Sequence, residues 1–350
     1  MSIALITGSS GLVGSEASTF FLDKGFEVAG IDNNERKKLF GIDGDTSKIK
    51  EKLKNYSKRY NHHSYDIVNS DKIEKLFKKF KKNIKIIIHA AAQPSHDWAY
   101  KDPLKDFKIN SLGTLNLLEL TKKYCPNAIF VFTSTNKVYG DNPNYLSFIE
   151  EKYRWELPRS HKYFKGIDEN FSIDKCRHSL FGASKLYADI LVQEYGKNFG
   201  LKTVAFRAGC ITGPNHSGAK LHGFLSYLVK SCVRERKYNL IGYKGKQVRD
   251  NIHSHDLINC FWEFFKSPKS GEVYNIGGGR KSNCSVLEAI NIVEKKTNIN
   301  VKKIFHKNPR VGDHQWYISN TKKFSEHYPN LRQKFNTEKI IDQLLENFYN

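Results

Sequence analysis

The feature that most constrains this chain is a glycine-rich turn between its first strand and its first helix. The apolar run from Ile3 to Thr7 passes into Gly8-Ser9-Ser10-Gly11-Leu12-Val13-Gly14, and an apolar stripe at helical spacing continues to Phe21. Glycines let the backbone turn sharply and approach an anion, while the free amides and the dipole of the helix stabilise negative charge. The turn therefore predicts a pyrophosphate site at Gly8, Gly11, Leu12, Val13 and Gly14.

The second strand supports a dinucleotide at this site. It runs from Glu27 to Asp32 and ends 18 residues after Gly14, where a carboxylate can accept hydrogen bonds from both ribose hydroxyls. Asp32, with Asn33 beside it, favours NAD over NADP because a carboxylate repels a 2′-phosphate. The alternative is an ordinary glycine turn followed by a strand that happens to end in Asp.

Short apolar runs alternate with helical segments along the first part of the chain, as in a parallel sheet covered on both faces. We therefore predict an α/β fold, a doubly wound Rossmann sheet over 1–208 with a smaller substrate-binding lobe over 209–350. One strand within about 251–276 is expected to return to the sheet, and 217–237 reads as a helix. The predicted sheet strands are Ile3–Thr7, Glu27–Asp32, Lys85–Ala90, Ala128–Ser134, Thr203–Arg207 and Glu272–Ile276.

The charge of the chain bears on which kinds of partner it could bind. The 57 Lys and Arg against 36 Asp and Glu give a net charge of +21. The excess is local, because 48–85 holds 13 Lys/Arg and four Asp/Glu, a net +9. Apolar residues at helical spacing between these lysines favour a solvated helix face, with a polyanion-binding surface as the alternative.

The sequence gives no indication of a membrane, a metal or a disulfide. No apolar run approaches the roughly 18 residues of a membrane-spanning helix, and the start lacks a charged leader, so a cytoplasmic protein is expected. The six cysteines are scattered without Cys-x-x-Cys pairing. His253, His255 and Asp256 are close in sequence, but no fourth ligand accompanies them, so no metal site is predicted.

The glycine spacing, Gly-x-x-Gly-x-x-Gly, resembles that of the extended short-chain dehydrogenases/reductases, the family of nucleotide-sugar epimerases and dehydratases. Further segments match this family in order along nearly the whole chain. Asp66-Ile67 resembles its adenine-contacting pair, Ala90-Ala91-Ala92-Gln93 its strand-end cofactor loop, and Asn110 lies in its mid-helix Asn motif. The resemblance implies NAD as the cofactor, Gln93 at the substrate and a homodimer.

Later segments resemble the CDP-paratose 2-epimerase branch of that family. Ser134-Thr135-Asn136-Lys137-Val138-Tyr139-Gly140 is similar to its hydroxyl-bearing segment. The resemblance implies a nucleotide-diphosphate sugar as substrate, with a CDP-sugar favoured. Arginine forks bind phosphate oxygens in pairs, which suits a diphosphate. The substrate-binding residues predicted with Gln93 are Asn136, Asn215, His216, Gln247, Arg249, Arg310 and Asp313.

In this family a Tyr-x-x-x-Lys pair carries out the proton transfer, since a sugar hydroxyl gives up hydride only as its proton leaves. Here the lysine is Lys185, but the tyrosine position is Phe181, whose phenyl ring exchanges no proton. The resemblance implies that Ser134 or Thr135 holds the sugar oxygen and that Lys185 also binds the nicotinamide ribose. Candidates for the missing base are Cys176, His178, Tyr187 and Lys185 itself.

The resemblance implies NAD-dependent epimerisation of a nucleotide-sugar, at C2 through a transient ketone, in cell-envelope (lipopolysaccharide) synthesis. A related 4-epimerase, dehydratase or reductase is the alternative within the class. A non-catalytic dinucleotide-binding protein that holds RNA or a protein on its basic face is the alternative outside it, although nucleic acid is not the expected partner. The insert 149–175 reads either as a substrate lid or as a surface packing element.

Overall fold

The computed structural model describes residues 2–216 and 223–349, which form two compact units. Unit 1 comprises Met1–Thr135, Leu180–Arg207 and Ile258–Tyr274, and unit 2 comprises Asn136–Ser179, Ala208–Leu257 and Asn275–Asn350. The chain therefore passes between the units several times. A single boundary at residue 208 does not describe this division, because 136–179 clusters with the later segments.

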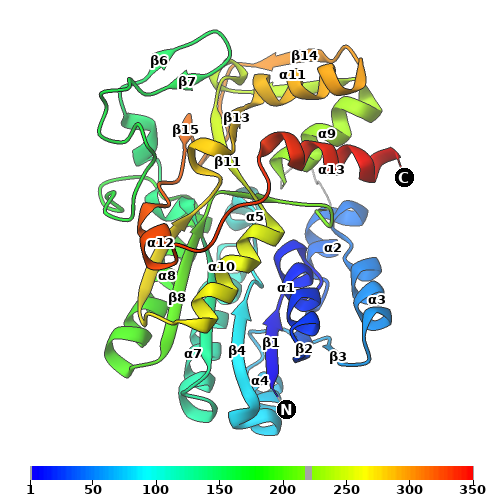
Figure 1. Cartoon of the computed structure of the whole chain (residues 1–350), viewed down its shortest axis with the longest axis vertical. Helices are drawn as coiled ribbons and strands as arrows, with labels where there is room; N and C mark the ends of the chain where they lie inside the picture. Colours follow the sequence, from blue (N-terminus) through cyan, green and yellow to red (C-terminus); the bar gives the residue numbers. More distant parts are fainter. Residues whose placement is uncertain (1, 217–222, 350) are drawn as a thin grey trace. The chain divides into compact units, whose positions relative to one another are not determined.

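Unit 1 is built on a seven-stranded sheet (Figure 1). Neighbouring strands among β3, β2, β1, β4 and β5 pair in parallel. This arrangement confirms the predicted α/β sheet. In spatial order the strands are β12 (Glu272–Ile276), β8 (Lys202–Ala208), β5 (Ile129–Thr135), β4 (Ile84–His89), β1 (Ile3–Thr7), β2 (Glu27–Ile31) and β3 (Tyr60–His63).

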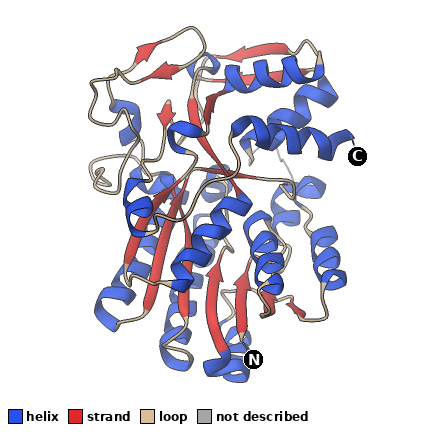
Figure 2. Ribbon diagram, in the orientation of Figure 1, coloured by secondary structure: helices blue, strands red, loops and turns tan. Residues whose placement is uncertain are grey.

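Helices cover both faces of this sheet, as the blue and red elements of Figure 2 show. On one face, side chains of α4, α7 and α8 form a core with Leu5, Ile87 and Phe130. On the other, Phe21 of α1 packs edge-on against Trp262 of α10. The helices and short turns of unit 1 are α1 (Leu12–Asp23), α2 (Glu35–Phe40), η1 (Gly41–Gly44), α3 (Ser47–Tyr56), α4 (Ser70–Phe80), η2 (Lys81–Asn83), α5 (His96–Lys101), α6 (Pro103–Phe107), η3 (Lys108–Leu112), α7 (Gly113–Tyr124), α8 (Ser179–Phe199) and most of α10 (Ser254–Lys266).

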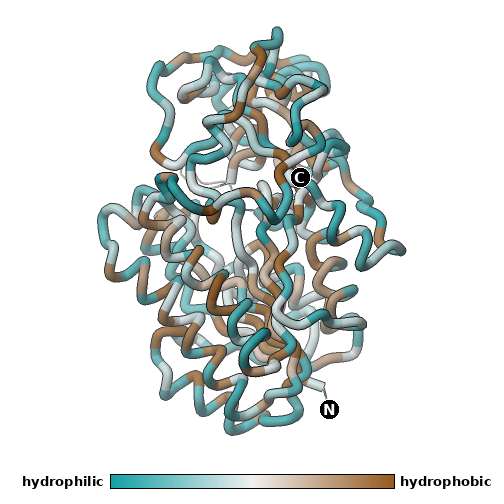
Figure 3. The backbone as a smooth tube through the Cα atoms, turned by 90° about the vertical axis from the view of Figure 1, so that its left-hand side faces the viewer, coloured by the Kyte–Doolittle hydropathy of each residue, from teal (hydrophilic) through white to brown (hydrophobic). Residues whose placement is uncertain are grey.

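Hydrophobic patterning explains these elements. All five residues of β1 are buried, as are Ile86, Ile87 and Ile88 of β4, because helices pack on both faces of the strands. The helices instead alternate between hydrophobic and hydrophilic residues, visible as brown and teal along the tube of Figure 3. The predicted sheet strands are thus confirmed to within one or two residues.

Unit 2 has smaller sheets and its own apolar core. Its core side chains come from α9, α11 and α13 and include Leu228, Ile290 and Leu344. Strand β11 pairs with β9, β13 and β15, and β10 pairs with β14. The elements are η4 (Asn136–Tyr139), η5 (Asn142–Tyr145), β6 (Ile149–Glu150), β7 (Trp155–Glu156), β9 (Cys210–Thr212), α9 (Phe224–Glu235), β10 (Lys237–Ile241), η6 (Tyr243–Gly245), β11 (Val248–His253), η7 (Gly279–Lys281), β13 (Asn283–Ser285), α11 (Val286–Thr297), β14 (Lys302–His306), β15 (Trp316–Tyr317), α12 (Lys322–His327) and α13 (Thr337–Tyr349).

Two elements differ from the sequence prediction. Strand β3 was not predicted, because Tyr60-Asn61-His62-His63 is polar and lies at the edge of the sheet. The helix expected over 217–237 is α9, which begins at Phe224, and 217–222 lie outside the described residues. Within the described part of the chain, no helix combines the length and apolar character needed to cross a membrane.

Candidate active site

The glycine turn of unit 1 has room for backbone only. Gly8 has a φ of +68°, and a Cβ on Gly14 would lie 2.0 Å from the carbonyl oxygen of Gly8. A Cβ on Gly8 would lie 2.8 Å from the backbone nitrogen of Ala91, which follows β4. Gly11 caps α1, so Leu12 and Val13 form its first turn. This glycine cradle, which any side chain would fill, fits a dinucleotide pyrophosphate.

Asp32 lies at the end of β2 beside this turn. Its carboxylate accepts hydrogen bonds from the backbone nitrogens of Ser10, at 3.0 Å, and Asn34, at 2.8 Å. Tyr60 of β3 closes the same region, with its hydroxyl 3.0 Å from Ser9 Oγ, and burial raises the pKa of that phenol to about 12. Asp32 is therefore held at the strand end, where a carboxylate meets the hydroxyls of a ribose.

The other predicted cofactor residues are spread over unit 1. The side chain of Asn33 is exposed and caps the backbone of Glu35. Asp66 is exposed and bonds the nitrogen of Val68, whereas Ile67 is buried. Ala90, Ala91 and Ala92 are half-buried and follow β4. The segment formed by these three alanines therefore lies next to Gly8 of the glycine turn.

A buried polar network centred on Gln93 and Asn110 joins the loop after β4 to helix α8. Asn110 Oδ1 accepts from the Gln93 backbone at 3.0 Å, and Asn110 Nδ2 donates to Ser184 Oγ at 3.1 Å. Gln93 Nε2 donates to Asp106 Oδ1 at 2.7 Å. Burial raises the pKa of Asp106, although its hydrogen bonds with Ser184 and Gln93 act to lower it. The side-chain amide of Gln93, which is predicted to bind substrate, hydrogen-bonds to Ser95 and Asp106 and so holds this loop.

Ser134 also faces inward. Its hydroxyl donates to Asp189 Oδ2 at 2.5 Å, and Arg207 makes two hydrogen bonds to the same carboxylate, at 3.1 and 2.8 Å. Asp189 is fully buried and Arg207 is nearly so. Ser134 thus completes this buried ion pair, whereas the side chain of Thr135, the other hydroxyl predicted to hold a sugar oxygen, is half-buried.

Lys185 of α8 is 4% exposed, and its ammonium group donates to the carbonyl oxygen of Thr133 at 2.8 Å. The same nitrogen lies 4.0 Å from the centre of the Phe132 ring. Burial lowers the pKa of Lys185 to about 7, although Asp189 and Asp106 oppose the shift. This lysine therefore exchanges its proton near neutral pH.

Phe181 lies one helical turn before Lys185 and is 8% exposed. Its ring centre is 5.0 Å from that of His96, with the ring planes at 66°. His178 faces its own loop, since Nε2 lies 2.7 Å from the Ile173 carbonyl oxygen and 3.3 Å from Cys176 Sγ. Tyr187 is exposed and packs against Phe107. Of these side chains, only that of His96 is in ring contact with Phe181.

The predicted diphosphate residues gather in unit 2. Arg249 forms an ion pair with Asp313 through Nη2, and Lys137 Nζ donates to the Gly312 carbonyl oxygen at 2.8 Å. Burial lowers the pKa of Lys137 to about 8, with Asp313 opposing and Arg249 adding to the shift. Arg310 belongs to the same loop and is exposed. Lys137, which the sequence did not single out as a binding residue, thus adds a third cation beside Arg249 and Arg310.

The remaining predicted substrate residues are more scattered. Gln247 Nε2 bonds the Ile241 carbonyl oxygen at 3.1 Å, and Asn136 is buried in η4. Asn215 and His216 are half-buried after β9, and the backbone of His216 accepts from Ser226 Oγ. The Nε2 atom of His253 lies 2.8 Å from Gln343 Oε1. In the residues described, no three His, Cys, Asp or Glu side chains form a metal-binding group.

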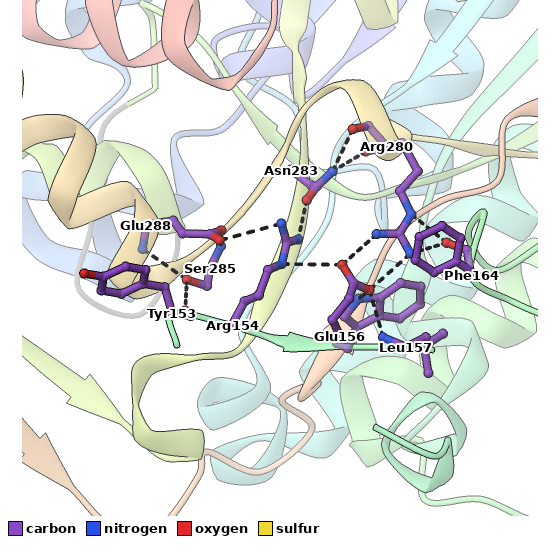
Figure 4. A network of polar contacts seen from close by, with 11 residues as sticks. Tyr153, Arg154, Glu156, Leu157, Phe164, Arg280, Asn283, Ser285 and Glu288 are labelled. Carbon is purple, nitrogen blue, oxygen red and sulfur yellow. Dashed lines mark hydrogen bonds and ion pairs between the residues drawn. The ribbon is translucent and has the colours of Figure 1, made fainter. Parts of the chain in front are cut away.

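The insert 149–175 is tied down within unit 2 (Figure 4). Arg280 binds Glu156 through two nitrogens, at 2.7 and 3.1 Å, and its guanidinium lies 4.0 Å from the Phe164 ring centre. Arg154 donates to Asn283 Oδ1 at 2.5 Å. Paired arginine–carboxylate contacts of this kind are geometrically specific. The structure therefore favours a packing element over a lid.

The basic segment 48–85 forms α3, β3 and α4 of unit 1. Lys52, Lys54, Lys72 and Lys75 are exposed. Glu74 pairs with Lys78 at 3.1 Å and with Lys123 at 2.9 Å. Ile73, Leu76 and Phe77 are buried on the other side of α4. The pattern is that of an amphipathic helix with a solvated lysine face.

Fold and site together define a dinucleotide-binding protein of the epimerase type. Residues 4–277 match the model of the NAD dependent epimerase/dehydratase family, and the chain belongs to that family. The predicted family and its cofactor NAD are thereby confirmed. The chain is 30% identical to the CDP-paratose 2-epimerase of Salmonella typhi over 350 residues, which is 97% of this chain and 98% of that protein.

Other relatives and solved structures are similar to this chain over most of its length. A putative UDP-glucose 4-epimerase of Methanocaldococcus jannaschii is 26% identical over 88% of this chain and 87% of its own. Pal from Bacillus thuringiensis superimposes with a TM-score of 0.80 at 21% identity, covering 99% of both chains. The Thermus thermophilus UDP-glucose 4-epimerase complex with NAD gives 0.77 at 24% identity, also over 99% of both. These structures share the fold.

Replacing Gly14 by Ala tests the fit of the glycine turn to a pyrophosphate. The new methyl group cannot remain 2.0 Å from the Gly8 carbonyl oxygen, so the loop must move away from the anion. We expect NAD affinity, measured by calorimetry, to fall more than about tenfold, which corresponds to only about 1.4 kcal/mol. Gly200→Ala, at a positive-φ position with open space, is the control. Equal affinity in both variants would contradict this interpretation.

The buried Lys185 predicts a pH-dependent stability. Between pH 7 and its ordinary pKa of 10.5 the unfolded state binds a proton that the folded state lacks, so the free energy of unfolding rises with pH. The slope is about 1.4 kcal/mol per pH unit. Urea unfolding at pH 7.5 and 9.5 should show a gain of roughly 2 to 3 kcal/mol over the matched change in Lys185→Met. Parallel pH profiles of the two proteins would refute the lowered pKa.

Proposed function

We propose that this protein is an NAD-dependent nucleotide-sugar epimerase that inverts C2 of a CDP-sugar. The observation that carries the proposal is the intact cofactor frame in unit 1, and a cationic cluster in unit 2 adds a place for a diphosphate. The similarity to the Salmonella typhi CDP-paratose 2-epimerase over 97% of the chain supports the choice of base and carbon. The family resemblance also favours a homodimer.

The cofactor frame would hold NAD through the chain's own groups. The Gly8–Gly14 turn binds the pyrophosphate, and Asp32 accepts hydrogen bonds from the adenosine ribose. Lys185, on α8 of the same unit, would bind the nicotinamide ribose, as the family resemblance implies. Bound NAD supplies an oxidant that takes hydride from the sugar carbon and returns it.

The cationic cluster would hold the substrate diphosphate. Three positive charges gather around the loop that holds Gly312 and Asp313, from Lys137, Arg249 and Arg310. The carboxylate of Asp313 offsets only one of them. A diphosphate carries two negative charges, which balances the remainder. The Arg249 guanidinium is mostly buried, and its orientation is set by Asp313 and by the Val248 carbonyl oxygen, so it is pre-organised for a phosphate oxygen.

The reaction needs one hydroxyl group positioned and one proton moved. Thr135 would donate to the C2 oxygen as the carbonyl forms. Epimerisation then requires the keto-sugar to rotate, so that hydride returns to its opposite face. Phe181 is buried and its phenyl ring carries no exchangeable proton, so proton transfer would fall to another side chain.

Incubation in deuterated water tests the proposal. CDP-, UDP- and dTDP-sugars are each mixed with the protein, and products are followed by proton NMR. We expect inversion at C2 of a CDP-sugar with protium retained at C2, because the hydride never exchanges with solvent. Deuterium at the inverted carbon would refute a hydride mechanism.

The other outcomes identify the alternatives. Inversion at C4 of any substrate would indicate a 4-epimerase, and loss of water would indicate a dehydratase. Conversion of no nucleotide-sugar, with salt-sensitive RNA binding instead, would favour a non-catalytic protein that uses its lysine face. Each of these results would replace the proposed function.

A further inference from the structure

The chain lacks the family's phenol but places an imidazole against the residue that replaces it. His96 opens α5, and its ring centre lies 5.0 Å from that of Phe181 in an edge-to-face arrangement. Rings at this separation are in direct contact. A sugar hydroxyl that bound beside the phenyl ring would therefore also have the imidazole nearby.

Hydrogen bonds hold the loop that carries His96. The backbone nitrogen of Ser95 donates to Gln93 Oε1 at 2.6 Å, and Gln93 Nε2 donates back to the Ser95 carbonyl oxygen at 2.9 Å. Ser95 Oγ in turn accepts from the Trp98 nitrogen and caps α5. The residue just before His96 is thus bonded on both sides of its peptide, which limits movement of the imidazole.

The same network reaches the helix that carries Phe181 and Lys185. Asn110 bonds the backbone of Gln93 on one side and Ser184 Oγ on the other, and Ser184 Oγ donates to the Phe181 carbonyl oxygen at 3.0 Å. All of these groups are buried. This buried network therefore joins the loop that precedes His96 to the backbone of Phe181 within unit 1. Such support is what a catalytic group requires in order to stay in productive geometry.

The other candidate bases are less suited. The Nε2 atom of His178 and the thiol of Cys176 contact each other and the Ile173 carbonyl oxygen, so both side chains are directed into their own loop. Tyr187 is exposed and packs on Phe107. Lys185 donates to Thr133 and is required at the ribose. The imidazole of His96, in contrast, is in ring contact with Phe181.

We propose that His96 is a catalytic residue that accepts the proton of the sugar hydroxyl in place of the missing phenol. The inference rests on the proposed epimerase function. In the oxidation step the C2–H bond breaks and its electron pair passes as hydride to NAD. The O–H bond breaks at the same time, its proton moves to an imidazole nitrogen, and a C2 ketone forms. In the return step hydride adds to the opposite face of C2 and the imidazolium gives its proton back to the oxygen.

Chemical rescue tests this role. His96→Ala should lower kcat about 100-fold or more with little change in KM, since general bases typically contribute this much. Added imidazole should restore activity in proportion to its concentration. His96→Ala/Phe181→Tyr should also regain activity, because it supplies the family's phenol beside Lys185. His96→Gln, which keeps a polar side chain of similar length, guards against misfolding and should be as slow as His96→Ala.

The matched control is His306→Gln on β14, an exposed histidine whose ring bonds Asn239. It should keep wild-type kcat and show no response to imidazole. An active wild-type protein whose His96 variants retain kcat within about threefold would overturn the role of His96 alone. Low activity that neither imidazole nor Phe181→Tyr restores would also overturn it. A wild-type protein that converts no nucleotide-sugar would overturn the proposed function and this inference together.

Discussion

The ammonium group of Lys185 is buried against the carbonyl oxygen of Thr133, and the electrostatics around α8 depend on that placement. A cation in a low-dielectric interior is costly, which is why its pKa falls to about 7. Burial, together with the positive charge of Lys185, also lowers the pKa of His89 to about 3 and so favours its neutral form. The sheet and α8 thus bury a lysine whose charge changes near neutral pH, at the position where the proposed function places the nicotinamide ribose.

Much of this frame can be read from the sequence. Three features are encoded by neighbouring residues: the glycine turn, the fully apolar strands and Asp32. Their structure is set by local backbone conformation and by burial, which the local sequence reveals. Strand β3 is different, because Tyr60 is its only buried residue and the remainder is polar at an open edge. The periodicity of a half-buried edge strand is too weak to distinguish it from a loop.

The site was harder to predict because its contacts join distant segments. Ser134 matches a catalytic motif, yet its hydroxyl belongs to a buried pair formed by Asp189, 55 residues later, and Arg207. Lys137 lies inside a recognised motif, but its importance emerges only when Gly312 and Asp313 meet it. His96 carries no signal in its own spacing. Its contact with Phe181 appears only when the loop after β4 meets α8.

A single-turnover experiment tests the central claim most directly, that the bound sugar is oxidised and reduced again within one active site. The protein loaded with one equivalent of NAD is mixed with a CDP-sugar, and the near-ultraviolet absorbance of reduced nicotinamide is followed by stopped flow. The account predicts a transient rise that decays as the C2 epimer accumulates, without any added reductant. Formation of the epimer with protein freed of NAD, at the same rate and with no absorbance change, would contradict it.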